Sequence, residues 1–74
     1  MSDLCFGEII RAARQARDLS QAALAAKLGC SQAAVAQFEA CEKPVGEATM
    51  TKVAVALGIT VPELLREGLR KAGL

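Results

Sequence analysis

The sequence predicts an all-α protein, a compact bundle of five short helices that forms one domain over residues 1–74. Three observations support this fold class. The apolar fraction of 53% comes largely from alanine, leucine and valine, whereas the aromatic residues that favour sheets make up 3%. Apolar residues recur at helical spacing in five segments. Serine, threonine, glycine and proline stand between these segments, as they do where helices begin and end.

The first helix is expected from just after Asp3 to about Arg17. Asp3 is the predicted N-cap, because its carboxylate can accept a hydrogen bond from the free N–H groups of the first turn. Asp18 should end the helix, since aspartate is one of the few residues other than glycine that tolerate the left-handed conformation. One face of this helix carries an apolar stripe of Phe6, Ile9, Ile10 and Ala13.

The next two helices are short, and each begins with a Ser-Gln pair. Ser20 and Ser31 are the predicted N-caps. Gly29 follows the first of these helices, where a C-terminal glycine is expected. The tight turn through Gly29 holds the two helices at a steep angle, so residues 20–39 have the outline of a helix-turn-helix. The residues expected to face inward are Leu24, Ala25, Leu28, Val35 and Phe38.

The outer side of the third helix is uncharged, and most of its side chains are small. It consists of Gln32, Ala33, Ala36, Gln37 and Ala40. A solvated face of an ordinary bundle helix carries lysine and glutamate. The composition of this side therefore requires an explanation other than solvation.

A loop through residues 41–46 leads to the fourth helix, because Pro44 and Gly46 interrupt any helical pattern. The fourth helix is predicted over residues 47–57, and Gly58 ends it. Its apolar stripe consists of Met50, Val53, Ala54 and Leu57.

The C-terminal helix is expected over about residues 61–71. Thr60 and Glu63 form a capping box, and a proline lies inside the first turn. Gly68 and Gly73 should weaken the end of this helix. Its apolar side consists of Leu64, Leu65 and Leu69.

Composition argues against several kinds of site. Cys5, Cys30 and Cys41 form no Cys-x-x-Cys pair and the chain has no histidine, so neither a zinc site nor a disulfide is expected. We interpret the cysteines as small apolar side chains of a reduced, cytoplasmic protein. No leader and no apolar run of ~20 residues is present, so no membrane association is expected. Without histidine, clustered carboxylates or a glycine-rich phosphate loop, we predict no catalytic activity, metal or cofactor.

Several motifs, taken in their order along the chain, resemble the lambda-repressor/Cro type of helix-turn-helix domain, the XRE family of bacterial and phage regulators. The resemblance covers roughly residues 6–66. The motifs are Phe6-Gly-Glu-Ile-Ile10, Arg14, Leu19-Ser-Gln-Ala-Ala-Leu-Ala25, Leu28-Gly29, Ser31-Gln32, Val35, Phe38-Glu39, Pro44, Ala54-Val-Ala-Leu-Gly58 and Val61-Pro-Glu-Leu-Leu65. The resemblance implies five helices, of which the third enters the major groove of DNA and the second lies across the backbone.

The resemblance also implies roles for individual residues. Arg14 and Glu39 would form a structural ion pair between the first and third helices. Cys41 stands where the family often has glycine, which leaves the path of the loop open. The base-contacting residues would be Gln32, Ala33, Ala36 and Gln37. Phosphate contacts are expected from Gln21, Ser31 and Lys43, with Arg11 and Lys27 as secondary candidates.

The expected function is sequence-specific binding of double-stranded DNA by a transcriptional regulator, a dimeric repressor. A homodimer is expected because one short helix reads only a few base pairs. Its surface would consist of Val61, Leu64, Leu65, Leu69 and Leu74. The alternative is a protein-binding module on the same fold, such as an antitoxin. A net charge of only +1 and the apolar C-terminal segment favour that alternative.

Overall fold

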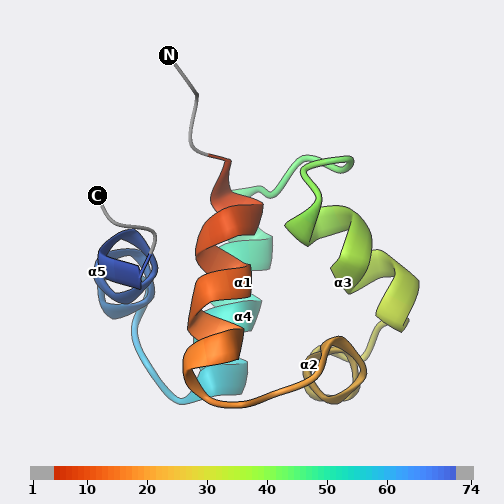
Figure 1. Cartoon of the computed structure of the whole chain (residues 1–74), viewed down its shortest axis with the longest axis horizontal. Helices are drawn as coiled ribbons and strands as arrows, with labels where there is room; N and C mark the ends of the chain where they lie inside the picture. Colours follow the sequence, from red (N-terminus) through yellow and green to blue (C-terminus); the bar gives the residue numbers. More distant parts are fainter. Residues whose placement is uncertain (1–4, 72–74) are drawn as a thin grey trace.

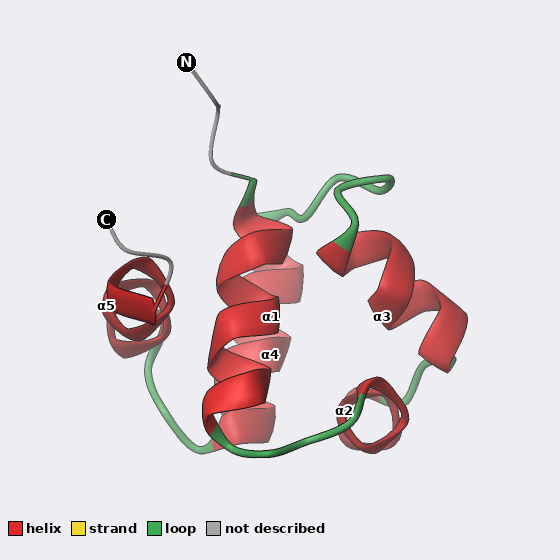
Figure 2. Ribbon diagram, viewed as in Figure 1, coloured by secondary structure: helices red, strands yellow, loops and turns green. Residues whose placement is uncertain are grey.

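The structure is a computed structural model that describes residues 5–71, and these residues form five helices and no strand (Figures 1 and 2). The helices are α1 (Phe6–Ala16), α2 (Gln21–Leu28), α3 (Gln32–Glu39), α4 (Glu47–Leu57) and α5 (Val61–Lys71). The all-α class and the order of the five helices are confirmed. No single helix in this range is long and apolar enough to span a membrane, and α4 and α5 reach that length only together, across a bend of 86°.

The predicted caps account for most helix boundaries. The hydroxyl of Ser20 accepts from Ala23 N–H at 3.0 Å, and that of Ser31 accepts from Ala34 N–H at 3.1 Å. The capping box before α5 is present too, because Thr60 N–H donates to Glu63 Oε1 at 3.1 Å. These local hydrogen bonds satisfy backbone groups that a helix end leaves unpaired.

Three helix ends use the left-handed backbone conformation that was expected of them. Asp18 has a φ of 54° just after α1, and Gly29 and Gly58 have φ values of 72° and 73° after α2 and α4. Only a residue that tolerates positive φ can reverse the chain in this way. The turns after these three helices are therefore specified by single residues.

The start of α1 differs from its prediction. Asp3, the predicted N-cap, lies outside the described residues, and the N-cap of α1 is Cys5. Its sulfur accepts from Gly7 N–H at 3.2 Å, and its own N–H donates to Glu8 Oε2 at 3.4 Å. The helix therefore begins at Phe6, and the side chain of Phe6 is 49% exposed instead of belonging to the buried stripe.

The core lies around α1. In Figure 1, α5 lies on one side of α1, α2 and α3 lie on the other, and α4 runs behind it. The centre is aliphatic, as expected for a small all-α domain with few aromatic residues. The largest fully buried side chains are Ile9, Ile10, Leu24, Val35, Val53 and Leu64. Leu28 and Leu57 are partly buried and pack against this cluster.

Two glycines allow α1 to approach its neighbours closely. A Cβ atom on Gly7 would lie 2.8 Å from the carbonyl carbon of Phe38, and one on Gly68 would lie 2.9 Å from the Cα of Ile9. Side chains larger than hydrogen do not fit at these positions without movement of backbone. Gly68 therefore permits the contact between α1 and α5 and does not fray the helix, which continues to Lys71. Gly73 lies outside the described residues.

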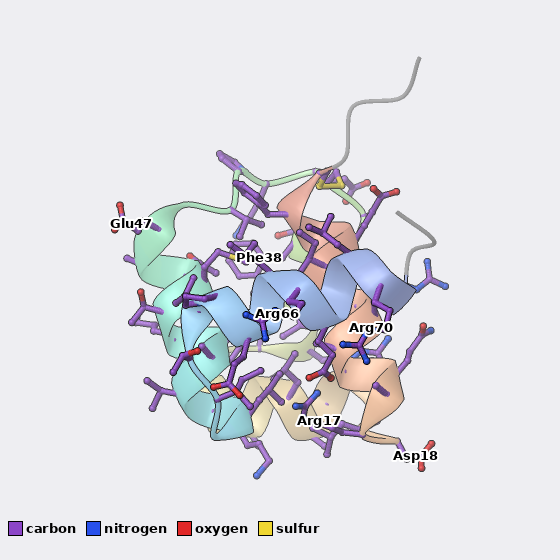
Figure 3. The ribbon with its side chains drawn as sticks, turned by 90° about the vertical axis from the view of Figure 1, so that its left-hand side faces the viewer. Arg17, Asp18, Phe38, Glu47, Arg66 and Arg70 are labelled. Carbon is purple, nitrogen blue, oxygen red and sulfur yellow. A yellow bond between two sulfur atoms is a disulfide. The ribbon has the colours of Figure 1, made fainter. Side chains whose placement is uncertain are left out.

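An ion pair that the sequence did not indicate joins α1 to α5. Arg17 Nη1 donates to Glu67 Oε1, and Arg17 Nη2 donates to Glu67 Oε2 at 3.0 Å (the region of Arg17 in Figure 3). This hydrogen bonding lowers the pKa of the Glu67 carboxyl and raises the pKa of Arg17. Both side chains remain partly exposed, at 26% and 33%. Pairs of this kind contribute little to stability.

The cysteines also differ from their prediction, because Cys5 and Cys41 form a disulfide with their Cα atoms 6.2 Å apart. Figure 3 shows the sulfur–sulfur bond at the start of α1. Cys30 is a free thiol and is exposed, so it is not an apolar filler either. The partners are 36 residues apart in sequence and meet because the start of α1 packs against the end of α3. Spacing and cysteine count carry no information about such a tertiary contact.

Candidate nucleic-acid interface

The two helices α2 and α3 form a helix-turn-helix. Figure 1 looks along α2, whereas α3 lies across the view, so the two axes are steeply inclined. The turn between them consists of Gly29, Cys30 and Ser31. Cys30 N–H donates to Ala25 O at 3.0 Å, which closes the end of α2 before the chain enters α3. This turn presents α3 at the surface of the domain.

A buried hydrogen-bonded ion pair, which the family resemblance implied, holds α3 against α1. Arg14 Nε donates to Glu39 Oε2 at 2.7 Å, and Arg14 Nη2 donates to Glu39 Oε1 at 3.0 Å. The remaining nitrogen, Nη1, donates to Leu19 O at 2.6 Å. The side chains of Arg14 and Glu39 are only 11% and 3% exposed. This two-pronged geometry is the strongest form of such a pair.

Gln21 extends this network to α2. Its Nε2 donates to Glu39 Oε1 at 3.1 Å, so one carboxylate receives hydrogen bonds from α1 and α2 while it belongs to α3. No buried side-chain nitrogen or oxygen in residues 5–71 lacks a partner. Hydrogen bonds among Arg14, Gln21 and Glu39 therefore hold α1, α2 and α3 together, and every buried polar side-chain atom of these residues has a partner.

The predicted base-contacting residues lie on one side of α3. Gln32 and Ala33 are exposed in its first turn, and Ala36 and Gln37 are partly buried one turn later. Residues at these spacings share a helix face. Val35 and Glu39, which occupy the opposite side, are buried. The exposed side of α3 thus carries amide and methyl groups and no charge.

Two of the predicted phosphate-contacting residues lie at helix N-termini, and the third lies in the loop after α3. Gln21 opens α2, and its amide keeps one N–H beyond the bond to Glu39. Ser31 opens α3 and is exposed; its oxygen caps the helix, which leaves its hydroxyl proton free to donate. Lys43 is exposed in the loop after α3, and its backbone N–H donates to Gln37 O at 3.3 Å. All three residues border the helix-turn-helix.

The secondary candidates, Arg11 and Lys27, occupy different places. Arg11 is exposed and lines a hollow of about 250 Å³ whose other walls come from the ion-pair network and from Ala36 and Ala40 of α3. Lys27 instead lines a groove against α4, beside Val55. Arg14 lines the same hollow but is paired with Glu39, whereas Arg11 is an exposed cation beside Ala36 and Ala40 of α3.

The predicted dimer residues do not form one exposed patch. Leu64 is 0% exposed and belongs to the core of its own chain, so it cannot contact a second copy, and Leu74 lies outside the described residues. Val61, Leu65 and Leu69 are partly buried and pack against that core. Val61 and Leu65 also line an apolar hollow of about 200 Å³ beside the half-exposed Phe6.

Comparisons with known proteins agree with this geometry. A family model described as "Helix-turn-helix" matches residues 10–64. The solution structure of the DNA-binding domain of the P22 C2 repressor is 32% identical, with a TM-score of 0.75 over 93% of this chain and 90% of that one. The clp gene regulator ClgR from C. glutamicum is 25% identical, with a TM-score of 0.76 over 86% of this chain and 83% of that one.

A third similar structure is that of Fe(II) HppE in complex with substrate, which is 28% identical with a TM-score of 0.69 over 80% of this chain but only 34% of that one. No curated protein gives a significant match. The match to the family model spans most of the sequence and includes both helices of the turn. The chain belongs to the helix-turn-helix family, in its lambda-repressor/Cro (XRE) branch.

Proposed function

We propose that this protein binds double-stranded DNA in a sequence-specific manner and acts as a transcriptional regulator, with α3 in the major groove. One observation carries the proposal: the outer side of α3 is uncharged and is exposed at Gln32 and Ala33, while the buried Arg14–Glu39 pair fixes the inner side. A rigid helix with amide groups on its outer side is suited to read base edges. The likeness to the P22 C2 repressor domain supports the same function.

The chemistry of base reading follows from the side chains. Gln32 and Gln37 can each donate to and accept from the edge of an adenine, and the methyl groups of Ala33 and Ala36 can meet the methyl group of thymine. We therefore propose A·T pairs within each half-site. Each well-formed two-bonded contact discriminates against the wrong base by about 1–3 kcal/mol.

The phosphate contacts position α3 on the duplex. Gln21 and Ser31 sit at helix N-termini, where free N–H groups and the helix dipole favour a phosphate oxygen. Lys43 and Arg11 add two positive charges at the edge of the same surface. A net charge of +1 gives little attraction for DNA in general, so affinity has to come from these placed contacts.

We further propose that a homodimer occupies the operator and represses transcription by blocking a promoter. The domain measures 32 × 25 × 22 Å, so two copies side by side can place two α3 helices about one turn of DNA apart, ~34 Å. Of the predicted surface, Val61, Leu65 and Leu69 remain as candidates for the contact. Sedimentation of the protein with and without operator measures the stoichiometry, and one protomer per operator contradicts the dimer.

The test of the proposed function starts from DNA sequences selected from a random pool. Their affinity for the wild type and for the Gln32→Ala/Gln37→Ala variant is measured by fluorescence anisotropy at two salt concentrations, with Thr51→Ala on the exposed side of α4 as the control. Loss of specific binding in the folded double variant, but not in Thr51→Ala, supports the proposal. Absence of any binding at low salt refutes it and favours the protein-binding alternative.

A further inference from the structure

We propose that the disulfide between Cys5 and Cys41 is a reversible redox switch that regulates DNA binding, an inference that rests on the proposed function. The bond connects the N-cap of α1 to the second residue after α3. It therefore restrains the position of the loop that carries Lys43. Proteins meet DNA in compartments where disulfides are rare and transient, and where those that form are commonly redox-sensing.

The loop has few other attachments. Residues 40–44 are all exposed, and the next residue that packs against the core is Val45. Backbone hydrogen bonds tie the loop only to α3: Cys41 N–H donates to Phe38 O at 3.1 Å, and Glu42 N–H and Lys43 N–H donate to Gln37 O at 2.9 and 3.3 Å. The disulfide is thus the side-chain tether between this loop and α1.

The backbone at Cys41 opposes the folded path of the loop. Its φ is 63°, in the left-handed region that residues other than glycine seldom adopt. In the oxidised form the cross-link keeps Cys41 in this conformation. In the reduced form only the backbone hydrogen bonds to α3 hold Cys41 in this conformation, so the loop opens away from the end of α3 more often, taking the ammonium group of Lys43 with it.

Formation of the Cys5–Cys41 bond requires an oxidant, and a low-molecular-weight disulfide such as oxidised glutathione can serve as one. One cysteine thiolate of the protein attacks that disulfide, releasing a glutathione thiolate, and the other cysteine thiolate then displaces the second glutathione from the mixed disulfide. The two electrons and the two thiol protons of the protein end on two molecules of reduced glutathione. Reduction reverses these steps.

The structure also indicates which sulfur is attacked during reduction. Cys41 is the exposed residue of the pair and Cys5 is partly buried, so we infer that the incoming thiolate attacks Cys41. Cys5 then leaves as a thiolate at the N-terminus of the eleven-residue helix α1, where Gly7 N–H donates to it at 3.2 Å. Free N–H groups and the helix dipole stabilise negative charge at this place.

The experiment uses the Cys30→Ser variant, which removes the one free thiol of the described residues and so prevents exchange with Cys30. The protein is equilibrated with oxidised or reduced glutathione, and alkylation followed by mass spectrometry counts its free thiols. Affinity for the selected DNA and hydrogen exchange of the amides of Glu42, Lys43 and Val45 are then measured in each state. Two further variants, Cys5→Ser/Cys41→Ser and Cys41→Gly, serve as controls.

We expect the oxidised form to bind DNA about 2- to 12-fold more tightly, the range that ordering one long side chain is worth. Exchange of the loop amides should be faster in the reduced form. Cys5→Ser/Cys41→Ser should match the reduced form under both conditions. Cys41→Gly, which forms no cross-link but tolerates the φ of 63°, should fall between the two states.

The outcomes separate the switch from the proposed function. Equal affinity and equal amide exchange in the two redox states overturn the switch while DNA binding stands. A redox response that persists in Cys5→Ser/Cys41→Ser overturns it as well. Absence of DNA binding in both states overturns the proposed function, and the regulation with it, even where the exchange of the loop amides changes.

Discussion

Replacing Glu39 with glutamine removes one charge from the buried pair and preserves the shape of the side chain. The change leaves the guanidinium of Arg14, which is only 11% exposed, without a counter-charge. Glutamine still offers one oxygen as an acceptor, and Arg14 keeps its hydrogen bond to Leu19 O. The variant therefore measures the value of the charge at the junction of α1, α2 and α3.

Removing one partner of a buried ion pair costs about 3–5 kcal/mol of unfolding free energy. Because some hydrogen bonds remain, we expect Glu39→Gln to lower the unfolding free energy by about 3 kcal/mol, the lower end of this range. For a domain of this size, each kcal/mol lowers Tm by about 4–8 °C, so we expect a loss of about 12–24 °C. Thermal and urea unfolding followed by circular dichroism, with the disulfide oxidised, measure both quantities.

Glu67→Gln is the matched control, because it makes the same change in the pair with Arg17, whose side chains are 26% and 33% exposed. Such a pair is worth less than about 1 kcal/mol. An Arg14→Met/Glu39→Leu variant, in which neither charge remains, should recover much of the lost stability. Equal losses in Glu39→Gln and Glu67→Gln would refute the structural role of the buried pair.

Three further predictions concern other parts of the molecule. Gly68→Ala should lower the unfolding free energy by about 1–3 kcal/mol, because the new methyl group meets the backbone of α1; unchanged urea unfolding contradicts this. The pKa of Glu67 lies below its ordinary value of 4.5, so its pairing with Arg17 stabilises above that pH and is lost as pH falls through the lowered pKa. The difference in unfolding free energy between wild type and Glu67→Gln should therefore disappear at acid pH. A difference that grows as the pH falls contradicts this prediction. Lys43→Ala should reduce the slope of log affinity against log salt concentration by about 1, the value of one phosphate contact, whereas Arg66→Ala on α5 should leave this slope unchanged. Equal slopes in the two variants contradict a phosphate contact by Lys43.

The parts of the fold that the sequence predicted well are those governed by local rules. Ser20 and Ser31 cap the backbone groups two or three residues away, and Asp18, Gly29 and Gly58 adopt positive φ at single positions. These interactions are complete within one turn of chain. The order of the helices and their approximate bounds therefore follow from the sequence.

The features that sequence reasoning missed depend on which helices meet in space and at which residues. The contact of Gly68 with Ile9, the pair of Arg17 with Glu67 and the disulfide all join segments that are far apart in the sequence. The apolar side of α5, taken alone, predicts that Leu64 contacts a second copy, whereas packing within the chain, mainly of α1 on α5, buries it. The pair of Arg14 and Glu39 is tertiary too, and the family resemblance supplied it.

The candidate interface was predicted as a set of residues but not as a surface. Helical spacing places Gln32, Ala33 and Gln37 on one side of α3, and in the structure the first two are exposed and Gln37 is partly buried. The bond from Gln21 to Glu39 and the hollow beside Arg11 could not be inferred, because both depend on the distance between α1 and α3.

The most direct test of base reading pairs a change in the protein with a change in the DNA. Each A·T pair of the selected half-site is replaced in turn by G·C, and the affinity of the wild type and of Gln32→Ala is measured for every site. We predict one position at which the replacement weakens the wild type by about 5- to 150-fold and Gln32→Ala hardly at all. If Gln32→Ala responds to every replacement as the wild type does, α3 does not read the bases through this residue.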